Sequence, residues 1–166
     1  MFLPYNSLWH EIYKYGMLYW NKAEKKVRFS SMKTIQIRNI TIGEGSFLNR
    51  GCYLMDCAPI ALGKHVFMGP DCGVYTAVHP FDAANRNTGL EKALPVTIED
   101  EVWLGGHVTI LPGVTIGRGS IIGAGSVVTK DVPAGVVAAG NPCKVLRALT
   151  EEDLAQCPRQ LAGQPE

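Results

Sequence analysis

Aliphatic residues recur at every sixth position through most of the chain, with a short slip and one long interruption. The series is Ile42, Leu48, Leu54, Leu62, Met68, Val74, Ile98, Leu104, Ile110, Ile116, Ile122 and Val128. The position four residues later is small or β-branched: Ser46, Cys52, Ala58, Val66, Cys72, Val78, Val102, Val108, Val114, Ser120, Ser126 and Val132. An α-helix repeats its faces every 3.6 residues, so it cannot use this period. A solenoid of short parallel strands can, because each six-residue unit supplies one strand and one corner.

The repeats divide the chain into three parts. Residues 1–30 do not repeat, and their aromatic residues have a rough helical spacing, so they predict a helix that packs on the first coils. Residues 31–147 predict an all-β parallel β-helix with an inserted polar loop at 80–95. Residues 148–166 predict a C-terminal helix and tail, because Thr150 precedes three acidic residues as an N-cap would.

The first segment has a second interpretation. Lys22, Lys25, Lys26 and Arg28 would suit a helix that lies on a membrane surface. We favour the packing helix, because the basic residues lie outside the aromatic stretch rather than on its opposite face. We therefore expect no membrane contact.

Composition narrows the classes of function. The formal net charge is +1, which does not indicate a nucleic-acid partner. No apolar run is long enough to span a bilayer, and no stretch resembles a secretory leader. The five cysteines include no C-x-x-C pair, so we expect reduced thiols and a cytoplasmic protein.

His79 is the candidate that the pattern singles out. It stands where the repeats stop, directly before the polar loop. Loops that extend from a rigid scaffold often carry catalytic and binding residues. Histidine is a suitable general base, because imidazole titrates near neutral pH. The alternative is a solvated corner residue without a chemical role.

Seven motifs occur in a fixed order over residues 40–148, and together they resemble one family. They are FLNRGC at 47–52, LMD at 54–56, TAVHP at 76–80, NTGLE at 87–91, VWLGG at 102–106, GAGSVVTKDVP at 123–133 and AGNPCK at 139–144. This set is similar to the maltose and galactoside O-acetyltransferases, a group that includes nodulation acetyltransferases, among the hexapeptide-repeat acetyltransferases.

The resemblance implies a left-handed parallel β-helix that assembles as a homotrimer with active sites between subunits. It implies transfer of acetyl from acetyl-CoA to a hydroxyl of a sugar or glycoside, by direct attack and without an acetyl-enzyme. His79 falls on the catalytic histidine of that family. The positions that match acceptor-binding residues are Asn49 and Asp56, and Glu91 is a candidate to orient an imidazole or a hydroxyl.

Other matching positions imply contacts with the coenzyme. Those residues are Trp103, Gly105, Gly106, Ala124, Thr129, Lys130, Lys144 and Arg147. The basic ones suit the phosphate groups of CoA, and the backbone N–H groups of the two glycines suit an oxyanion. Ordinary structural roles remain open for each: a packed tryptophan, a corner glycine, a solvated charge.

Two departures leave the acceptor undefined. The first residues are unlike the longer helical segment with which that family usually begins, and Gly51 stands where relatives often have asparagine. An antibiotic O-acetyltransferase of the same fold and a non-catalytic trimeric scaffold therefore stay as alternatives.

Hexapeptide-helix carbonic anhydrases offer a further alternative, since they bind zinc through three histidines between subunits. Here the candidates are His65, His79 and His107, which are 14 and 28 residues apart. These separations do not match the paired histidines expected of such a site, so no metal is expected.

Overall fold

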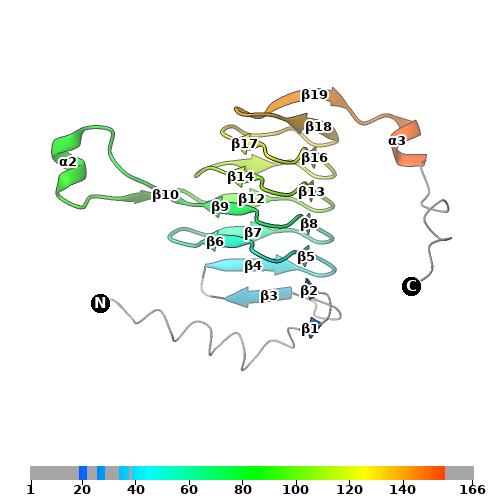
Figure 1. The fold of residues 1–166 in the computed structure, drawn as a ribbon, viewed down its shortest axis with the longest axis horizontal. Coiled ribbons are helices and arrows are strands. Elements are labelled where there is room, and N and C mark those ends of the chain that lie inside the picture. The colour runs from blue at the N-terminus through cyan, green and yellow to red at the C-terminus, as the bar shows by residue number, and fades with distance from the viewer. Residues whose placement is uncertain (1–18, 22–25, 29–33, 38, 156–166) are drawn as a thin grey trace.

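A computed structural model describes residues 19–21, 26–28, 34–37 and 39–155. The described chain winds into a solenoid whose coils stack along one axis (Figure 1). Three sheets form its sides, and parallel pairing between successive coils builds each of them. The β-helix that the six-residue period predicted is therefore present in the described residues.

The three sheets are named here A, B and C. Sheet A contains β1 (Tyr19–Asn21), β2 (Lys26–Arg28), β5 (Phe47–Leu48), β8 (Phe67–Met68), β13 (Trp103–Leu104), β16 (Ile121–Ile122), β18 (Val136–Ala139) and β19 (Lys144–Ala148). Sheet B contains β15 (Thr115–Ile116), β12 (Val96–Ile98), β7 (Ile60–Leu62), β4 (Ile40–Gly43) and β3 (Thr34–Ile37). Sheet C contains β17 (Val127–Val128), β14 (Thr109–Ile110), β9 (Gly73–Tyr75) and β6 (Tyr53–Met55).

Two corners of this triangular prism matter for function. We call the corner between sheets A and C, at 49–52, 69–72, 105–108 and 123–126, the glycine corner. We call the corner between sheets C and B, at 56–59, 76, 111–114 and 129–131, the arm corner.

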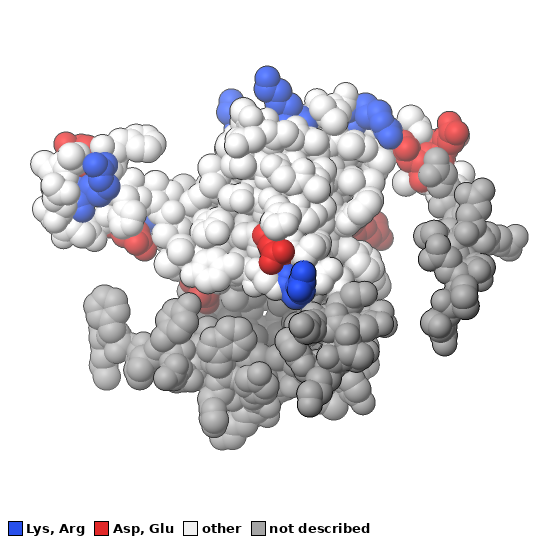
Figure 2. Space-filling view, viewed as in Figure 1, with Lys and Arg blue, Asp and Glu red and all other residues white. Residues whose placement is uncertain are grey.

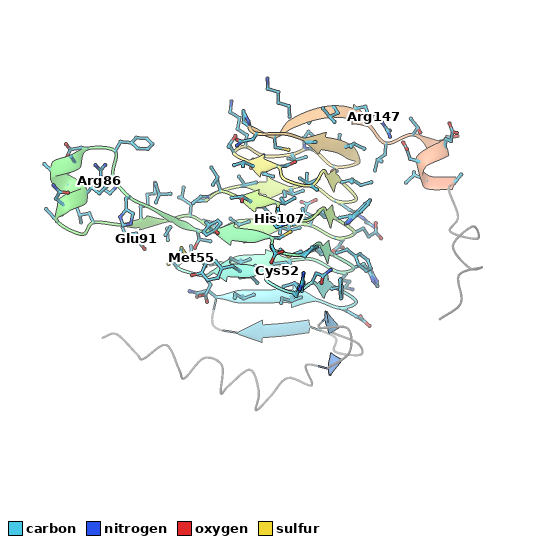
Figure 3. All side chains as sticks on the ribbon, viewed as in Figure 1. Cys52, Met55, Arg86, Glu91, His107 and Arg147 are labelled. Carbon is cyan, nitrogen blue, oxygen red and sulfur yellow. The ribbon has the colours of Figure 1, made fainter. Side chains whose placement is uncertain are left out.

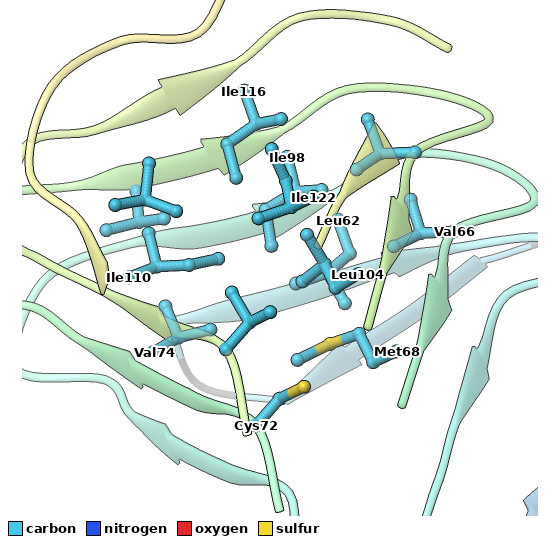
Figure 4. Packing of buried hydrophobic residues seen from close by; sticks show 14 of the residues in the cluster. Leu62, Val66, Met68, Cys72, Val74, Ile98, Leu104, Ile110, Ile116 and Ile122 are labelled. Carbon is cyan, nitrogen blue, oxygen red and sulfur yellow. The ribbon is translucent and has the colours of Figure 1, made fainter. Parts of the chain in front are cut away.

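The inward aliphatic positions form the core, as the repeat predicted. Eleven of the twelve are buried, and Leu54 is partly buried against them. Figure 4 shows these side chains stacked between the sheets. Full burial of one such side chain contributes about 1.5–3 kcal/mol, so the stacked columns hold the coils together.

Small polar side chains complete the corners. The Ser46 hydroxyl donates to the Gly63 carbonyl at 2.8 Å, and the Cys72 thiol donates to the Gly105 carbonyl at 3.1 Å. These bonds join one coil to the next and satisfy carbonyl groups that would otherwise be buried without a partner. The serine and cysteine residues of the repeat are therefore also hydrogen-bonding residues.

An arm leaves the solenoid after Thr76 (Figure 1). It consists of β10 (Ala77–Val78), α2 (Ala83–Asn87) and β11 (Lys92–Ala93), and β10 pairs antiparallel with β11. The predicted loop at 80–95 therefore contains a helix and a strand. The assignment of Val78 to a coil is wrong, because Val78 pairs with Lys92 in the arm. A β-branched residue suits either strand, so the pattern did not distinguish them.

Both ends of the solenoid differ from a plain coil. The predicted N-terminal helix lies mostly outside the described residues, but β1 and β2 within it form an antiparallel pair. β2 also pairs antiparallel with β5. It therefore covers the edge of sheet A at the first coil, which a helix would leave without hydrogen-bond partners. At the other end the predicted C-terminal helix is α3 (Glu151–Ala155), and the tail beyond it lies outside the described residues.

Candidate active site

A buried threonine fixes the start of the arm. Thr76 is fully buried, and its hydroxyl joins the arm corner of the preceding coil. Its Oγ1 donates to the Met55 carbonyl at 2.5 Å and accepts from the Ala58 N–H at 3.1 Å. The chain therefore leaves the solenoid from a fixed point, three residues before His79.

The His79 imidazole is held from one side and open on the other. Its Nδ1 lies 3.2 Å from the Leu90 carbonyl, across the base of the arm. A carbonyl only accepts, so we assign the Nδ1–H tautomer, with Nε2 unprotonated in the neutral ring. Nε2 lies 3.7 Å from Glu91 Oε2, and the two side chains are 56% and 41% exposed. This is the arrangement of an oriented base that is open to a ligand.

Cys57 is a member of this group that the sequence analysis did not identify. Its side chain is exposed and near Glu91, and slight desolvation together with the charges of Glu91 and Asp56 raises the pKa of its thiol. The thiol therefore stays protonated at neutral pH. The sequence offered one indication of this placement, since Cys57 directly follows Asp56, which was already a candidate site residue.

Glu91 lies beside His79 on the arm, between α2 and the solenoid (Figure 3), and Asp56 belongs to the arm corner of the preceding coil. Thr129 and Lys130 belong to the same corner, because β17, β14, β9 and β6 pair in register and end there. Both residues are exposed. Part of the predicted coenzyme set thus shares a corner with the predicted base.

The rest of the predicted set lies at the glycine corner. Asn49, Gly105, Gly106 and Ala124 are there, and the half-exposed Trp103 lies just before it on β13. Asn49 is therefore separated from Asp56 by the length of β6. Within one chain the two predicted acceptor residues do not meet.

The two glycines are not equivalent as oxyanion donors. The Gly105 N–H donates to the Ile122 carbonyl at 2.8 Å, as part of the pairing between coils. The prediction for Gly105 as an N–H donor is therefore wrong, because the solenoid already uses that group. The Gly106 N–H has no hydrogen-bond acceptor among the described residues, so it is the one available for an oxyanion.

Basic side chains gather where the solenoid ends, over β18 and β19 (Figure 2). Lys130 and Lys144 make no ion pair with any described residue. Arg147 is different, because its Nη2 donates to Asp153 Oδ1 at 2.9 Å and its Nη1 to Asp153 Oδ2. This contact holds the pKa of the Asp153 carboxyl well below its usual range. A phosphate at Arg147 would have to compete with Asp153.

Within one chain, the three histidines of the zinc alternative lie in separate segments: His65 between β7 and β8, His79 in the arm and His107 between β13 and β14. Over the described ranges, no group of three His, Cys, Asp or Glu side chains has the spacing of a metal site. His107 instead lies at the glycine corner, with its Nε2 3.8 Å from Asp71 Oδ2.

Comparison with known proteins agrees with the repeats of the solenoid. Residues 95–130 match the family model for the bacterial transferase hexapeptide, six repeats. Residues 95–130 are hexapeptide-transferase repeats. A "putative acetyltransferase" of Saccharomyces cerevisiae is 54% identical over 115 residues, which are 69% of this chain and 59% of that protein.

Two solved hexapeptide structures extend the similarity. A maltose O-acetyltransferase from Clostridium difficile 630 has 50% identity and a TM-score of 0.67, over 68% of this chain and 60% of that one. A hexapeptide-repeat acetyltransferase from Vibrio cholerae O1 biovar eltor, complexed with acetyl coenzyme A, has 42% identity and a TM-score of 0.67, over 68% and 62%. This chain spans less than two thirds of the length of each of these three proteins. In the part of the chain that the structure describes, no helix is long and apolar enough to cross a membrane.

Proposed function

We propose that this protein transfers acetyl from acetyl-CoA to a hydroxyl of a sugar or glycoside, with His79 as the general base. One observation carries the proposal: the Leu90 carbonyl orients the imidazole so that Nε2 faces the opening beside Glu91. The acetyltransferase relatives, one of them a maltose O-acetyltransferase, support the choice of reaction and acceptor.

The acetyl group is transferred directly, through one tetrahedral intermediate and without an acetyl-enzyme. The acceptor oxygen attacks the thioester carbonyl carbon, and its proton passes to His79 Nε2. The C–S bond then breaks, and the proton moves on to the sulfur of the departing coenzyme. The backbone N–H of Gly106 is positioned to stabilise the oxyanion, since the solenoid does not use it.

Coenzyme binding falls to residues at the edges of the prism. Lys130 and Lys144 are exposed cations that suit phosphate groups, and Trp103 offers an exposed ring beside the glycine corner. Thr129 and Ala124 lie next to them on the two corners. No metal is part of this proposal.

The active site requires more than one copy of the chain in this proposal. His79 belongs to the arm corner and Gly106 to the glycine corner, and sheet C separates them. A homotrimer of left-handed coils would bring the arm corner of one copy against the glycine corner of the next. The ligands would then bind in the groove between two copies.

Thiol release from acetyl-CoA tests the reaction. We would measure it with a panel of monosaccharides, disaccharides and glycosides, and with antibiotic alcohols for the rival function. His79→Asn should lower acceptor-dependent release by about 10²–10⁴-fold, which is the usual contribution of a general base. His65→Asn is the matched control, since it also changes an exposed histidine. Turnover that survives in His79→Asn would contradict the assignment, and failure to bind CoA would favour a scaffold.

Co-expression of two variants tests the shared site. His79→Asn disables the arm corner, and Trp103→Asp disables the approach to the glycine corner. Mixed trimers should recover part of the activity. At some interfaces the intact arm corner of the Trp103→Asp copy would meet the intact glycine corner of the His79→Asn copy. No recovery, in assemblies that sedimentation shows to be mixed, would place the whole site in one chain.

A further inference from the structure

One peptide group joins the buried side of the glycine corner to its outer side. The carbonyl of Gly105 and the N–H of Gly106 belong to the same peptide bond, which is trans. In a trans peptide the C=O and the N–H point in opposite directions. The carbonyl is directed into the solenoid, because the buried Cys72 thiol donates to it at 3.1 Å. The N–H is therefore directed away from the core.

The coils do not use the N–H at this position of the repeat. The register of sheet A places Pro70 at the same position in the preceding coil and Ala124 in the following one. Pro70 has no N–H, and the N–H of Ala124 donates to no described residue. The N–H groups on either side, those of Gly105 and His107, both donate to other coils. Among the described residues, nothing competes with a ligand for the Gly106 N–H.

The peptide is packed closely between successive coils. A Cβ on Gly69 would lie 2.5 Å from the Gly106 nitrogen, and a Cβ on Gly105 would lie 2.6 Å from the Ala124 nitrogen. Glycine at both positions therefore lets the coils approach one another here. The plane of the peptide has little room to turn, so a donor on its carbonyl acts on an N–H of fixed direction.

The thiol that donates to this carbonyl is not required by the fold. Figure 4 shows the sulfur of Cys72 directed into the aliphatic core, where the residue is 1% exposed. A carbonyl oxygen only accepts, so the thiol is the donor in the contact. Valine stands at the same position of the repeat in other coils, at Val66, Val102 and Val108. The coils therefore accept an aliphatic side chain at this position.

We propose that Cys72 is a positioning residue for acetyl transfer: its thiol holds and polarises the peptide between Gly105 and Gly106, so that the Gly106 N–H is a stronger donor to the oxyanion. This deepens the acetyl transfer proposed above and rests on it. Hydrogen bonds in a chain strengthen one another by about 10–30%. Loss of a whole oxyanion donor costs about 10²–10³-fold in kcat, so loss of the bond behind it should cost about 2–8-fold. Cys72 is buried and acts only through the peptide.

Variants of Cys72 test this role by turnover. Cys72→Val removes the donor and fills its place with a residue type that the repeat already has there. It should lower kcat by about 2–8-fold and leave the KM for acetyl-CoA unchanged, because the oxyanion exists only near the transition state. Cys72→Ala removes the same donor without the additional methyl group and should behave alike. Cys72→Ser keeps a donor and should retain the wild-type kcat.

Ser46→Val is the matched control for a purely structural effect. The Ser46 hydroxyl donates to the Gly63 carbonyl at 2.8 Å and accepts from the Val66 N–H at 3.0 Å. The N–H of the same peptide, on Lys64, already donates to Asp100 Oδ1. Ser46→Val therefore breaks two hydrogen bonds of the solenoid and should destabilise it at least as much as Cys72→Val. It should leave kcat unchanged.

The amide resonance of Gly106 gives a readout that does not depend on turnover. In protein labelled with ¹⁵N-glycine, its proton shift should move upfield in Cys72→Val, return in Cys72→Ser and stay unchanged in Ser46→Val. An unmoved resonance in Cys72→Val would overturn the proposal. A moved resonance with an unchanged kcat would also overturn it, because the polarised N–H would then not serve the reaction.

The outcomes distinguish this inference from the reaction itself. Equal kcat in the wild type and Cys72→Val, with His79→Asn inactive, would reject the role of Cys72 and retain acetyl transfer. An equal fall of kcat in Cys72→Val and Ser46→Val would assign the loss to weakened coils and would also reject that role. No turnover by the wild type with any acceptor would reject both.

Discussion

The solenoid and the arm are stabilised in different ways. Inward side chains of the coils, such as Ile98 and Leu104, are completely buried. The helix of the arm has no buried residue, and Phe81 beside it is 99% exposed. The arm depends on local hydrogen bonds instead: Asp82 caps α2, and Arg86 Nη1 donates to the carbonyls of Pro80 and Phe81. Stability therefore resides in the coils, and the arm adds little to it.

The candidate chemistry lies where these two regions meet. Thr76 is buried among the coils, and the arm begins directly after it. His79 comes three residues later, is exposed and directly follows β10. A rigid anchor with an open side chain suits a base that must keep its orientation and still meet a ligand. The contrast predicts that core changes affect stability and that arm changes affect activity.

Core truncation should give the largest stability effect. Ile98→Ala removes a buried side chain from a packed column and should cost about 2–5 kcal/mol of unfolding free energy. Phe81→Ala should change it by less than ~0.5 kcal/mol, because the ring is exposed. Denaturant unfolding of the two variants measures both. A large loss of unfolding free energy in Phe81→Ala would contradict the contrast between solenoid and arm. It would mean that a neighbouring copy covers the arm.

The sequence was a good guide to the core and a poor guide to the corners. Every sixth residue had to point inward once the chain coiled, so Ile98 and Leu104 could be placed without a structure. The corner that each polar residue reaches depends on how far the chain has wound. Asn49 and Asp56 are seven residues apart, yet they lie at opposite ends of β6.

Some properties of the site depend on partners far along the chain. The Gly105 N–H is used by Ile122, and the Arg147 guanidinium is used by Asp153. Neither contact follows from a motif, because each is set by the stacking of coils or by a turn after β19. Cys57 was overlooked for a similar reason, since its neighbour Glu91 comes from the other side of the arm.

A smaller effect is expected at the junction. Thr76→Val keeps the shape of the side chain but leaves the Met55 carbonyl and the Ala58 N–H without their partner. This should cost about 1–3 kcal/mol and should also lower acetyl transfer, because His79 loses its anchor. Thr76→Ser keeps the hydroxyl and should restore both. If Thr76→Val unfolds like the wild type, the arm is anchored elsewhere.

Loss of the α2 cap should be smaller still and confined to the arm. Asp82 Oδ2 accepts from the Asn85 N–H at 2.8 Å, and removal of such a cap costs about 1 kcal/mol of helix stability. Asp82→Ala should therefore speed amide exchange in 83–88 and leave exchange in the coils unchanged. Faster exchange in the coils would show that the arm and the solenoid unfold together.

Acid should give the smallest effect, at α3. Arg147 and the Thr150 N–H lower the pKa of Asp153, so the carboxylate stabilises this end of the chain above the ordinary aspartate pKa of about 3.9. That stabilisation is lost as the pH falls below this value and through the lower pKa of the folded state. Amide exchange in 151–155 should therefore quicken in acid while the coils, held by aliphatic side chains, keep their protection. Asp153→Asn should make exchange in this helix insensitive to pH once intrinsic rates are corrected. A persistent pH response in that variant would assign the effect to Glu151 or Glu152 and would leave the Arg147 contact without a measurable role.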